Sequence, residues 1–319
     1  MLALVKAGSS ASLRRVPDPV PQSHEALVRV NTFALTHRDL IDLVDPTGFR
    51  DVPYGTVVGR DFAGSVVEYP AAITPTAKMG AVQGARLVGT VRAGAWAELV
   101  AVPYTRLAGL PDNVADVQGS TLPTPGLAAL RALQHGGFLV GKEVLVTGAR
   151  GAVGRLACQL AHLAGAHVVA YVRPGERAPR SHRPLDQVPG ADRVTEQLPG
   201  RFDLIIETVG GETFGEAIES LEPGGLLVAV ATPELRGRVS FRTWRVDRSA
   251  GARIQFLDEY DDVTAADAIH TDLKRLVELV ATFKLDVGVA VEESWRNAAA
   301  VIEAVQERRI KGRVVFRPR

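Results

Sequence analysis

The chain has 319 residues, of which 46% are hydrophobic and 23% are charged, and its formal net charge is +1. This length exceeds what one ordinary hydrophobic core encloses, so we expect two domains. The near-neutral charge gives no reason to expect a nucleic acid or an anionic membrane as a partner, and no apolar stretch approaches the roughly 20 residues of a membrane span.

The N-terminus and the cysteine content both favour a cytoplasmic protein. The first residues, MLALVKAGSSASLRR, have no charged segment ahead of the apolar ones and continue into strand-like sequence, which does not fit a signal peptide. Cys158 is the only cysteine, which excludes an intramolecular disulfide and a cysteine-rich zinc site. We therefore expect a protein of the reducing cytoplasm.

The first third of the chain predicts short strands separated by turns. Strand-like runs occupy 26–30, 56–69, 85–91 and 96–102, and proline, glycine and aspartate residues punctuate them. This pattern is typical of an irregular, mostly antiparallel β domain.

From about residue 117 onward, strands alternate with helices. Predicted strands at 144–148, 167–172, 203–210 and 226–232 are interleaved with helical patterns over 126–134, 155–165 and 214–224. Such alternation indicates βαβ units and a parallel sheet. Segment 174–200 is rich in proline and arginine, and we predict an irregular connection there. A strand at 253–257, helices over 265–283 and 294–308, and a strand at 313–316 complete the chain.

A glycine turn follows the strand at 144–148. Gly148, Gly151 and Gly154 stand at the end of that strand and the start of the next helix. A bound diphosphate needs backbone N–H groups and a helix N-terminus directed at it, with no Cβ in the way. The GxxGxxG spacing is less specific than GxGxxG, but its strand–turn–helix–strand context is that of a dinucleotide fold. The alternative is a tight βα turn in an unrelated α/β protein.

The second strand of this unit indicates which dinucleotide binds. NAD sites usually have an acidic side chain at that strand end, whereas arginine accommodates the 2′-phosphate of NADP. Here the strand ends in Arg173, and the first carboxylate beyond it is Glu176. Arg173, followed by Arg177 and Arg180, can make charge-assisted hydrogen bonds with a phosphate, although a solvated loop is the usual role of such a charge run. We therefore expect NADPH as the cofactor.

The chain resembles the medium-chain dehydrogenase/reductase family, and within it the zinc-free quinone oxidoreductase and enoyl reductase branch. The resemblance runs nearly end to end and rests on GRDFAGSVVE, the turn ARGAVG, FDLIIETVGGETFGEAIESLEPGGLLVAVAT and the terminal GRVVF. The turn departs from the AxGGVG of this branch by having alanine at position 152. The resemblance implies an α/β fold in which a Rossmann doubly wound parallel sheet at 118–257 binds NADPH. It also implies a GroES-like, mostly β catalytic domain built from 1–117 and 258–319.

The same resemblance implies an active site in the cleft between the two domains and a homodimer, often joined through the last Rossmann strand, here 253–257. Strand ends and loops of both domains would border the cofactor. The residues expected to do so are Thr124, Gly148, Arg150, Gly151, Ala152, Val153, Arg173, Arg177, Val209, Gly210, Ala231, Thr232, Phe256, Leu257 and Arg313. Core packing is the alternative role for the strand ends, and helix capping is the alternative for Thr124.

The positions that hold zinc in the alcohol dehydrogenases of this family carry other residue types here. The family's cysteine in C-H-T-D corresponds to Thr36 in THRD, its histidine in G-H-E corresponds to Arg60 in GRD, and no cysteine stands near Pro123. Zinc needs cysteine, histidine or carboxylate ligands, and an arginine repels the cation. We therefore expect no metal.

Without zinc, this branch reduces an activated C=C with a hydride from NADPH, so the expected substrate is a small-molecule enone, an enoyl thioester or a quinone. Many relatives carry a tyrosine as candidate proton donor where this chain has Phe49. Thr36 stands where an asparagine often touches the nicotinamide. His37, whose pKa suits proton transfer, and Tyr54 are the replacement donors we consider.

Two charged residues near these candidates have structural alternatives. Asp39 is better explained as a helix N-terminal cap, and Arg60 as an ion-pair partner of Asp39 or Asp61 rather than as a clamp for a substrate anion. A short-chain dehydrogenase is excluded, because none of the five tyrosines is followed four residues later by lysine. A non-enzymatic NADPH-binding accessory or structural protein stays open, as does a reductase of carrier-bound enoyl thioesters.

Overall fold

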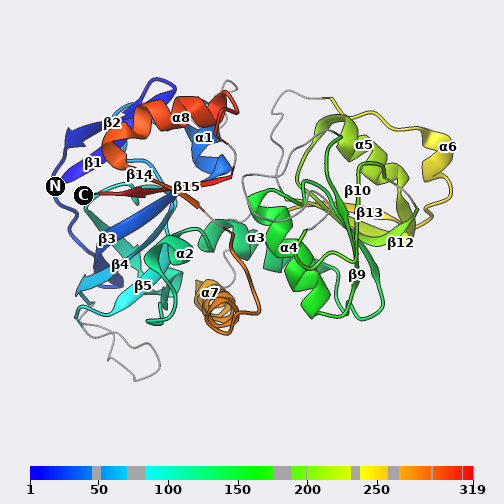
Figure 1. Cartoon of the computed structure of the whole chain (residues 1–319), viewed down its shortest axis with the longest axis horizontal. Helices are drawn as coiled ribbons and strands as arrows, with labels where there is room; N and C mark the ends of the chain where they lie inside the picture. Colours follow the sequence, from blue (N-terminus) through cyan, green and yellow to red (C-terminus); the bar gives the residue numbers. More distant parts are fainter. Residues whose placement is uncertain are drawn as a thin grey trace. The chain divides into compact units, whose positions relative to one another are not determined.

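The computed structural model of the chain describes residues 1–44, 52–69, 83–174, 188–198, 200–230, 238–257, 266–288, 290–310 and 312–318. The chain divides into two compact units: Met1–Thr124 with Val263–Arg319, and Pro125–Asp262. Figure 1 shows that the first unit is mostly β structure and that the second is a sheet with helices packed against it. No helix among the described residues is both long and apolar enough to cross a membrane.

The first unit is built on a seven-stranded sheet with the order β14-β15-β3-β4-β5-β7, in which β6 also pairs with β3. All pairs are antiparallel except β14 with β15, which is parallel. Its strands are β3 (Glu25–Leu35), β4 (Asp61–Glu68), β5 (Arg86–Thr90), β6 (Leu99–Pro103), β7 (Leu107–Gly109), β14 (Ala290–Ser294) and β15 (Arg313–Arg317). The two ends of the chain therefore share one sheet, because β15 pairs with β3.

An N-terminal hairpin and five helices complete the described part of this unit. The hairpin joins β1 (Leu2–Ala7) to β2 (Ser10–Arg15). The helices are α1 (His37–Val44), α2 (Asp116–Ser120), the start of α3 (Pro123–His135), α7 (Ala266–Ala281) and α8 (Ala298–Gln306), with short 3-10 turns at Tyr104–Arg106 and Trp295–Asn297. Helix α8 packs against β2, and α7 packs against β7.

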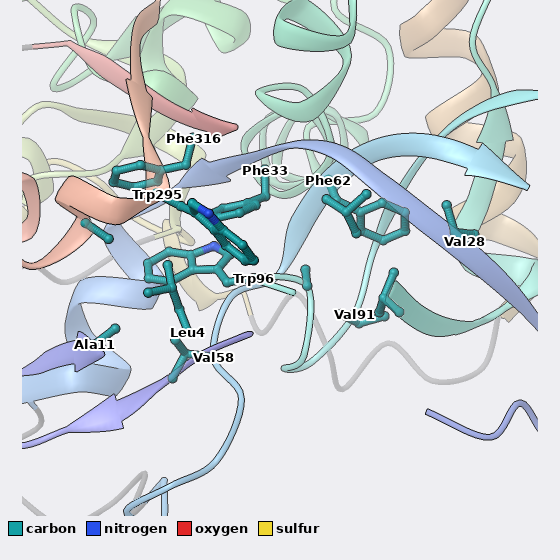
Figure 2. Close-up of a cluster of buried hydrophobic side chains, with 14 of the residues drawn as sticks. Leu4, Ala11, Val28, Phe33, Val58, Phe62, Val91, Trp96, Trp295 and Phe316 are labelled. Atoms are coloured by element: carbon teal, nitrogen blue, oxygen red, sulfur yellow. The ribbon is translucent and has the colours of Figure 1, made fainter. Parts of the chain in front are cut away.

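Aromatic side chains from distant parts of the chain form the core of the first unit (Figure 2). The Phe33 ring lies 5.6 Å from the ring of Trp96 and 5.5 Å from that of Phe316, measured between centroids. The indole N–H of Trp96 donates to the carbonyl of Ala34 at 3.1 Å, so this buried polar atom is satisfied. Gly59 makes room for the Trp96 ring, because a Cβ there would overlap it. These contacts tie the C-terminal strand to the N-terminal β structure.

The second unit contains six strands in the order β10-β9-β8-β11-β12-β13, and every pair is parallel. They are β8 (Glu143–Val146), β9 (His167–Tyr171), β10 (Arg193–Thr195), β11 (Phe202–Glu207), β12 (Leu221–Ala229) and β13 (Arg253–Phe256). Numbered along this unit, the order is 3-2-1-4-5-6, which is that of the Rossmann fold. The predicted doubly wound parallel sheet is therefore confirmed.

Among its described residues, the second unit contains the rest of α3, α4 (Ala152–Leu163), α5 (Gly211–Glu219) and the short α6 (Thr243–Val246). Helix α4 packs against β8 and β9, and α5 packs against β11 and β12. The strand order reverses direction between β8 and β11, which makes their carboxyl ends the topological switch point. Ligands of open α/β sheets bind there.

Several elements differ from the sequence-based expectation. Residues 221–224 were predicted to end a helix, but they begin β12, because Leu221 pairs with Phe202 ahead of a register shift. Strand β10 lies within the segment predicted to be irregular. Its three residues give too short a pattern to detect, and they are held by pairing with β9. The bounds of helix α1 were not predicted, although the capping role preferred for Asp39 implied a helix at this point.

Candidate functional site

The candidate cofactor site lies at the carboxyl ends of β8 and β11. Ile206 of β11 is in register with Val146 of β8, so both strands end at the same edge of the sheet. The glycine turn begins directly after β8 and leads into α4. The switch point and the predicted phosphate turn therefore coincide.

The turn is built so that side chains are excluded at two of its glycines. Gly148 has φ 58°, and a Cβ there would overlap the Thr208 hydroxyl and lie 3.1 Å from Val209 Cγ2. A Cβ on Gly154 would overlap the carbonyl oxygen of Gly148 and lie 2.8 Å from Ala149 Cα. The first turn of α4 therefore packs directly on the glycine turn. A helix N-terminus held against a turn whose glycines leave no Cβ in the way fits a diphosphate.

The second strand of the unit ends at the same edge. The backbone N–H of Ala149 donates to Tyr171 at 3.3 Å, and that of Val172 donates to Thr195 at 2.9 Å. Arg173 is exposed immediately beyond them. This is the position from which a guanidinium can reach a phosphate on an adenosine ribose. Arg177 and Arg180, predicted to assist Arg173, lie outside the described residues, as do Ala231, Thr232 and Phe49.

Strand β11 ends in a buried carboxylic acid, Glu207, which was not among the predicted site residues. Oε1 of Glu207 accepts hydrogen bonds from the backbone N–H of Val209 at 2.8 Å, from that of Gly210 at 2.9 Å, and from the Thr147 hydroxyl at 3.1 Å. Burial raises the pKa of Glu207, and these hydrogen bonds oppose the rise. A single acidic residue at the end of the apolar run DLIIE is the signal that would have found it.

This arrangement limits how Val209 and Gly210, both predicted to contact the cofactor, could do so. Both backbone N–H groups donate to Glu207, so those donors are not directed at a cofactor. Arg150, Ala152 and Val153 lie in the turn and at the start of α4, as predicted. Their roles as cofactor contacts stay predictions.

Phe256 and Leu257 stand at the end of the edge strand β13. The Phe256 side chain is 72% exposed, and its ring stacks on Phe214 with centroids 6.2 Å apart. The backbone N–H of Leu257 donates to Ala229 at 2.9 Å. The exposed Phe256 is not packed into the core, the role considered as the alternative, and its role as a cofactor contact stays a prediction.

Thr124 and Arg313 belong to the first unit. The Thr124 N–H and hydroxyl donate to the two oxygens of Asp61 at 2.8 and 2.7 Å. Asp61 is completely buried, and burial raises its pKa to about 7. Asp61 thereby caps α3, so Thr124 receives a cap instead of supplying one. Arg313 donates to the backbone oxygen of Thr121 at 3.0 Å.

Thr36 and Asp39 form a capping box at the start of α1. The Thr36 hydroxyl and N–H both donate to Asp39 Oδ2, at 2.6 and 2.8 Å, and the Asp39 N–H donates back to the Thr36 hydroxyl at 3.2 Å. The capping role preferred for Asp39 is therefore observed, with Thr36 as the N-cap residue. The predicted catalytic hydroxyl of Thr36 is at the same time bonded to a carboxylic acid.

Arg60 is buried beside this box and is held by two carboxylates. Its Nη2 donates to Asp42 Oδ2, and its Nε lies 3.8 Å from Asp39 Oδ1. Burial raises the pKa of Asp39 to about 6, and the Arg60 charge opposes that rise. The ion-pair role proposed for Arg60 thus involves Asp39 and Asp42. A guanidinium at this place does not fit a metal cation, and no group of three or more potential ligands occurs among the described residues.

His37 and Tyr54, the other predicted catalytic residues, lie near the surface. His37 is exposed, yet partial burial of its imidazole by the surrounding protein lowers its pKa, with a further contribution from the Arg38 charge. Its neutral form can accept a proton. The Tyr54 side chain is 75% exposed in a turn.

Comparison with known proteins places the chain in a family. A family model described as zinc-binding dehydrogenase matches residues 182–316. A zinc-type alcohol dehydrogenase-like protein of Schizosaccharomyces pombe is 31% identical over 239 residues, which cover 72% of this chain and 68% of that protein. An acryloyl-coenzyme A reductase of Sulfurisphaera tokodaii is 25% identical over 350 aligned positions that span both chains completely.

Solved structures show the same fold along the whole chain. A mycobacterial quinone oxidoreductase superposes with a TM-score of 0.84 at 21% identity and covers 100% of both chains. The same comparison finds a mycobacterial structure complexed with NADPH, with a TM-score of 0.83 at 20% identity. The fold, the glycine turn at the switch point and these relatives lead to one assignment. The chain belongs to the medium-chain dehydrogenase/reductase family of oxidoreductases, in its quinone oxidoreductase and enoyl reductase branch.

Proposed function

We propose that this protein is an NADPH-dependent, zinc-independent reductase that transfers a hydride to the activated C=C of an enone or enoyl thioester, or to a quinone. The observation that carries the proposal is the glycine turn at the switch point, with Arg173 at the end of the neighbouring strand. The names of the relatives agree with this reaction class, since they include acryloyl-coenzyme A reductases and quinone oxidoreductases.

The residues present fit NADPH in two places. The start of α4 and the glycine turn at Gly148 hold the diphosphate through backbone N–H groups and the helix dipole. Arg173 binds the 2′-phosphate through charge-assisted hydrogen bonds. When bound, NADPH supplies the hydride that reduces the substrate.

Thr36 is the proton donor or carbonyl partner that the geometry supports best. Its hydroxyl lies 2.6 Å from Asp39, whose pKa burial raises to about 6. When Asp39 is ionised, the Thr36 proton points at the carboxylate. When Asp39 is protonated, it can donate to the Thr36 oxygen and free the hydroxyl proton for a developing enolate. His37 and Tyr54 rank behind Thr36 as proton donors, because among the described contacts neither is hydrogen-bonded to a carboxylic acid.

The edge strand β13 is the surface we propose for a homodimer. Ile254 is 43% exposed and Phe256 is 72% exposed, although both are large and apolar. In sequence, Arg248 and Arg253 precede the edge residues, and the acidic run Asp258–Asp262 (DEYDD) follows them. Antiparallel pairing of two copies brings the basic end of one strand to the acidic end of the other.

Sedimentation experiments test this interface. Phe256→Asp should convert the dimer into monomers. A wild-type protein that is already monomeric at micromolar concentration would reject the interface.

A second candidate function is an NADPH-binding accessory protein without reductase turnover, which the phenylalanine at position 49 favours. Oxidation of NADPH, followed at 340 nm with a panel of enones, quinones and enoyl thioesters, separates the two. If the protein is a reductase, we expect turnover with at least one substrate class and a marked loss of this turnover in Thr36→Val. Tight NADPH binding with no turnover on any class would support the accessory role instead.

A further inference from the structure

The end of β11 carries a buried acid that none of the chemistry above uses. Glu207 is 0% exposed, and one of its oxygens, Oε1, accepts all three hydrogen bonds described for the side chain. Two of the donors are the successive backbone N–H groups of Val209 and Gly210. The carboxyl therefore fixes the conformation of the turn that leads from β11 into α5.

The third donor links this turn to the neighbouring strand. The Thr147 hydroxyl donates to Glu207 and accepts from the N–H of Thr208 at 2.9 Å. In return, the Thr208 hydroxyl donates to the backbone oxygen of Thr147 at 2.8 Å. The ends of β8 and β11 are thus joined by reciprocal hydrogen bonds at the switch point, beyond those of the sheet itself.

The residues that follow β11 lie against the glycine turn. Thr208 and Val209 occupy the space that a side chain at Gly148 would take. Any displacement of residues 208 and 209 therefore changes the room and the orientation available to the turn. Gly210, with φ 83°, is the N-cap of α5. Because the N–H groups of Val209 and Gly210 donate to Glu207, they are not available to an anion at the start of this helix.

We propose that Glu207, acting with Thr147, is a positioning residue of the dinucleotide site. The carboxyl holds the 208–210 turn against Gly148, so that the start of α4 is presented to the diphosphate. This inference rests on the proposed function, because it assumes that the glycine turn binds NADPH. Glu207 itself need not touch the cofactor.

Thr147 offers the cleanest matched pair of variants. Thr147→Val keeps the shape of the side chain but removes the hydroxyl that links Glu207 to Thr208, whereas Thr147→Ser keeps that hydroxyl. Ser249→Ala is the control for a lost buried hydroxyl in the same unit. Ser249 is 4% exposed and donates to Leu221 at 2.6 Å. Leu221 is the first residue of β12, whereas Thr147 follows the last residue of β8. Glu207→Gln keeps an acceptor for the turn, and Glu207→Leu does not.

The test measures NADPH affinity by fluorescence titration and the exchange of the 208–210 amides by hydrogen–deuterium exchange without cofactor. We expect Thr147→Val and Glu207→Leu to weaken NADPH binding at least tenfold and to speed exchange at 208–210. Thr147→Ser and Glu207→Gln should stay within about threefold of wild type, since each keeps the essential acceptor or donor. Ser249→Ala should lower the melting temperature without changing NADPH affinity.

The outcomes separate this inference from the proposed function. Wild-type protein that binds no NADPH would overturn both. If the wild type binds NADPH and Thr147→Val binds it equally well, only the positioning role is wrong. Faster amide exchange at 208–210 together with equal weakening in Thr147→Val and Ser249→Ala would also overturn it, because general destabilisation would then explain the loss.

Discussion

The glycine turn of the second unit and the cluster around Arg60 in the first unit solve a similar problem in different ways. Both place carboxylic acids in the protein interior. At the turn, Glu207 is satisfied by neutral backbone and hydroxyl donors, whereas in the cluster Asp39 and Asp42 face the charge of Arg60. Backbone geometry thus builds the candidate cofactor site, whereas paired charges hold Arg60, which the resemblance matches to a metal-binding histidine of the family's zinc enzymes.

The largest effect is expected from removing the charge at the centre of the cluster. Arg60→Ala leaves Asp39 and Asp42 without their cation, and breaking a buried pair in this way costs about 3–5 kcal/mol of unfolding free energy. Urea denaturation measures it. The double variant Arg60→Met with Asp42→Asn should recover part of the loss. An Arg60→Ala protein as stable as wild type would show that the cluster is not held by charge pairing.

The destabilisation caused by alanine substitutions in the glycine turn should depend on the space available to the added Cβ. A Cβ on Gly154 overlaps the backbone of Gly148, so Gly154→Ala should cost about 1–3 kcal/mol and abolish NADPH binding. A Cβ on Gly151 lies 3.0 Å from Gly148 O at φ −70°, so Gly151→Ala should destabilise far less. Thermal unfolding and NADPH titration of both variants check this order. Equal destabilisation would contradict the packing of α4 on the turn.

Arg173 should separate the two nicotinamide cofactors. Arg173→Ala removes a charge-assisted contact with the 2′-phosphate and should weaken NADPH binding by about 1.5–3 kcal/mol. Affinity for NADH should hardly change, because NADH lacks that phosphate. The Michaelis constants for both cofactors give the comparison, with Arg193→Ala, at an exposed arginine that begins β10, as the control. Equal losses for NADPH and NADH would reject the assignment of Arg173.

The smallest effect concerns pH. Burial raises the pKa of Asp61 to about 7 and that of Asp39 to about 6, both above the ordinary value of 3.8. The folded state therefore binds more protons than the unfolded state between about pH 4 and 7, and stability should fall as pH rises through that window. Asp61→Asn should make this slope shallower by at most about 1.4 kcal/mol per pH unit. Urea midpoints at several pH values test it, and an unchanged slope would contradict the raised pKa of Asp61.

The two regions also differ in how far the sequence predicts them. The glycine turn and Arg173 could be placed because strand, turn and helix follow one another within a single βαβ unit, and the local pattern fixes their geometry. The bonds from Thr124 to Asp61 and from Arg60 to Asp42 join residues 63 and 18 positions apart. No local pattern specifies such partners.

Glu207 was missed for a related reason. Its role depends on Thr147, which lies 60 positions away in sequence and becomes a neighbour only when β8 and β11 pair. The exposed position of Phe256 likewise depends on which strand forms the edge of the sheet. Sequence periodicity predicts that a residue belongs to a strand, but the sheet order decides what lies beside it.

The central claim is that the start of α4 and Arg173 together bind NADPH. Calorimetric titration of the wild-type protein with NADPH and NADH, combined with hydrogen–deuterium exchange of the saturated complex, tests it most directly. We predict that NADPH binds at least ten times more tightly than NADH, and that it protects the backbone amides of residues 148–156. No heat of binding with either nucleotide, or protection confined to other segments, would contradict the account.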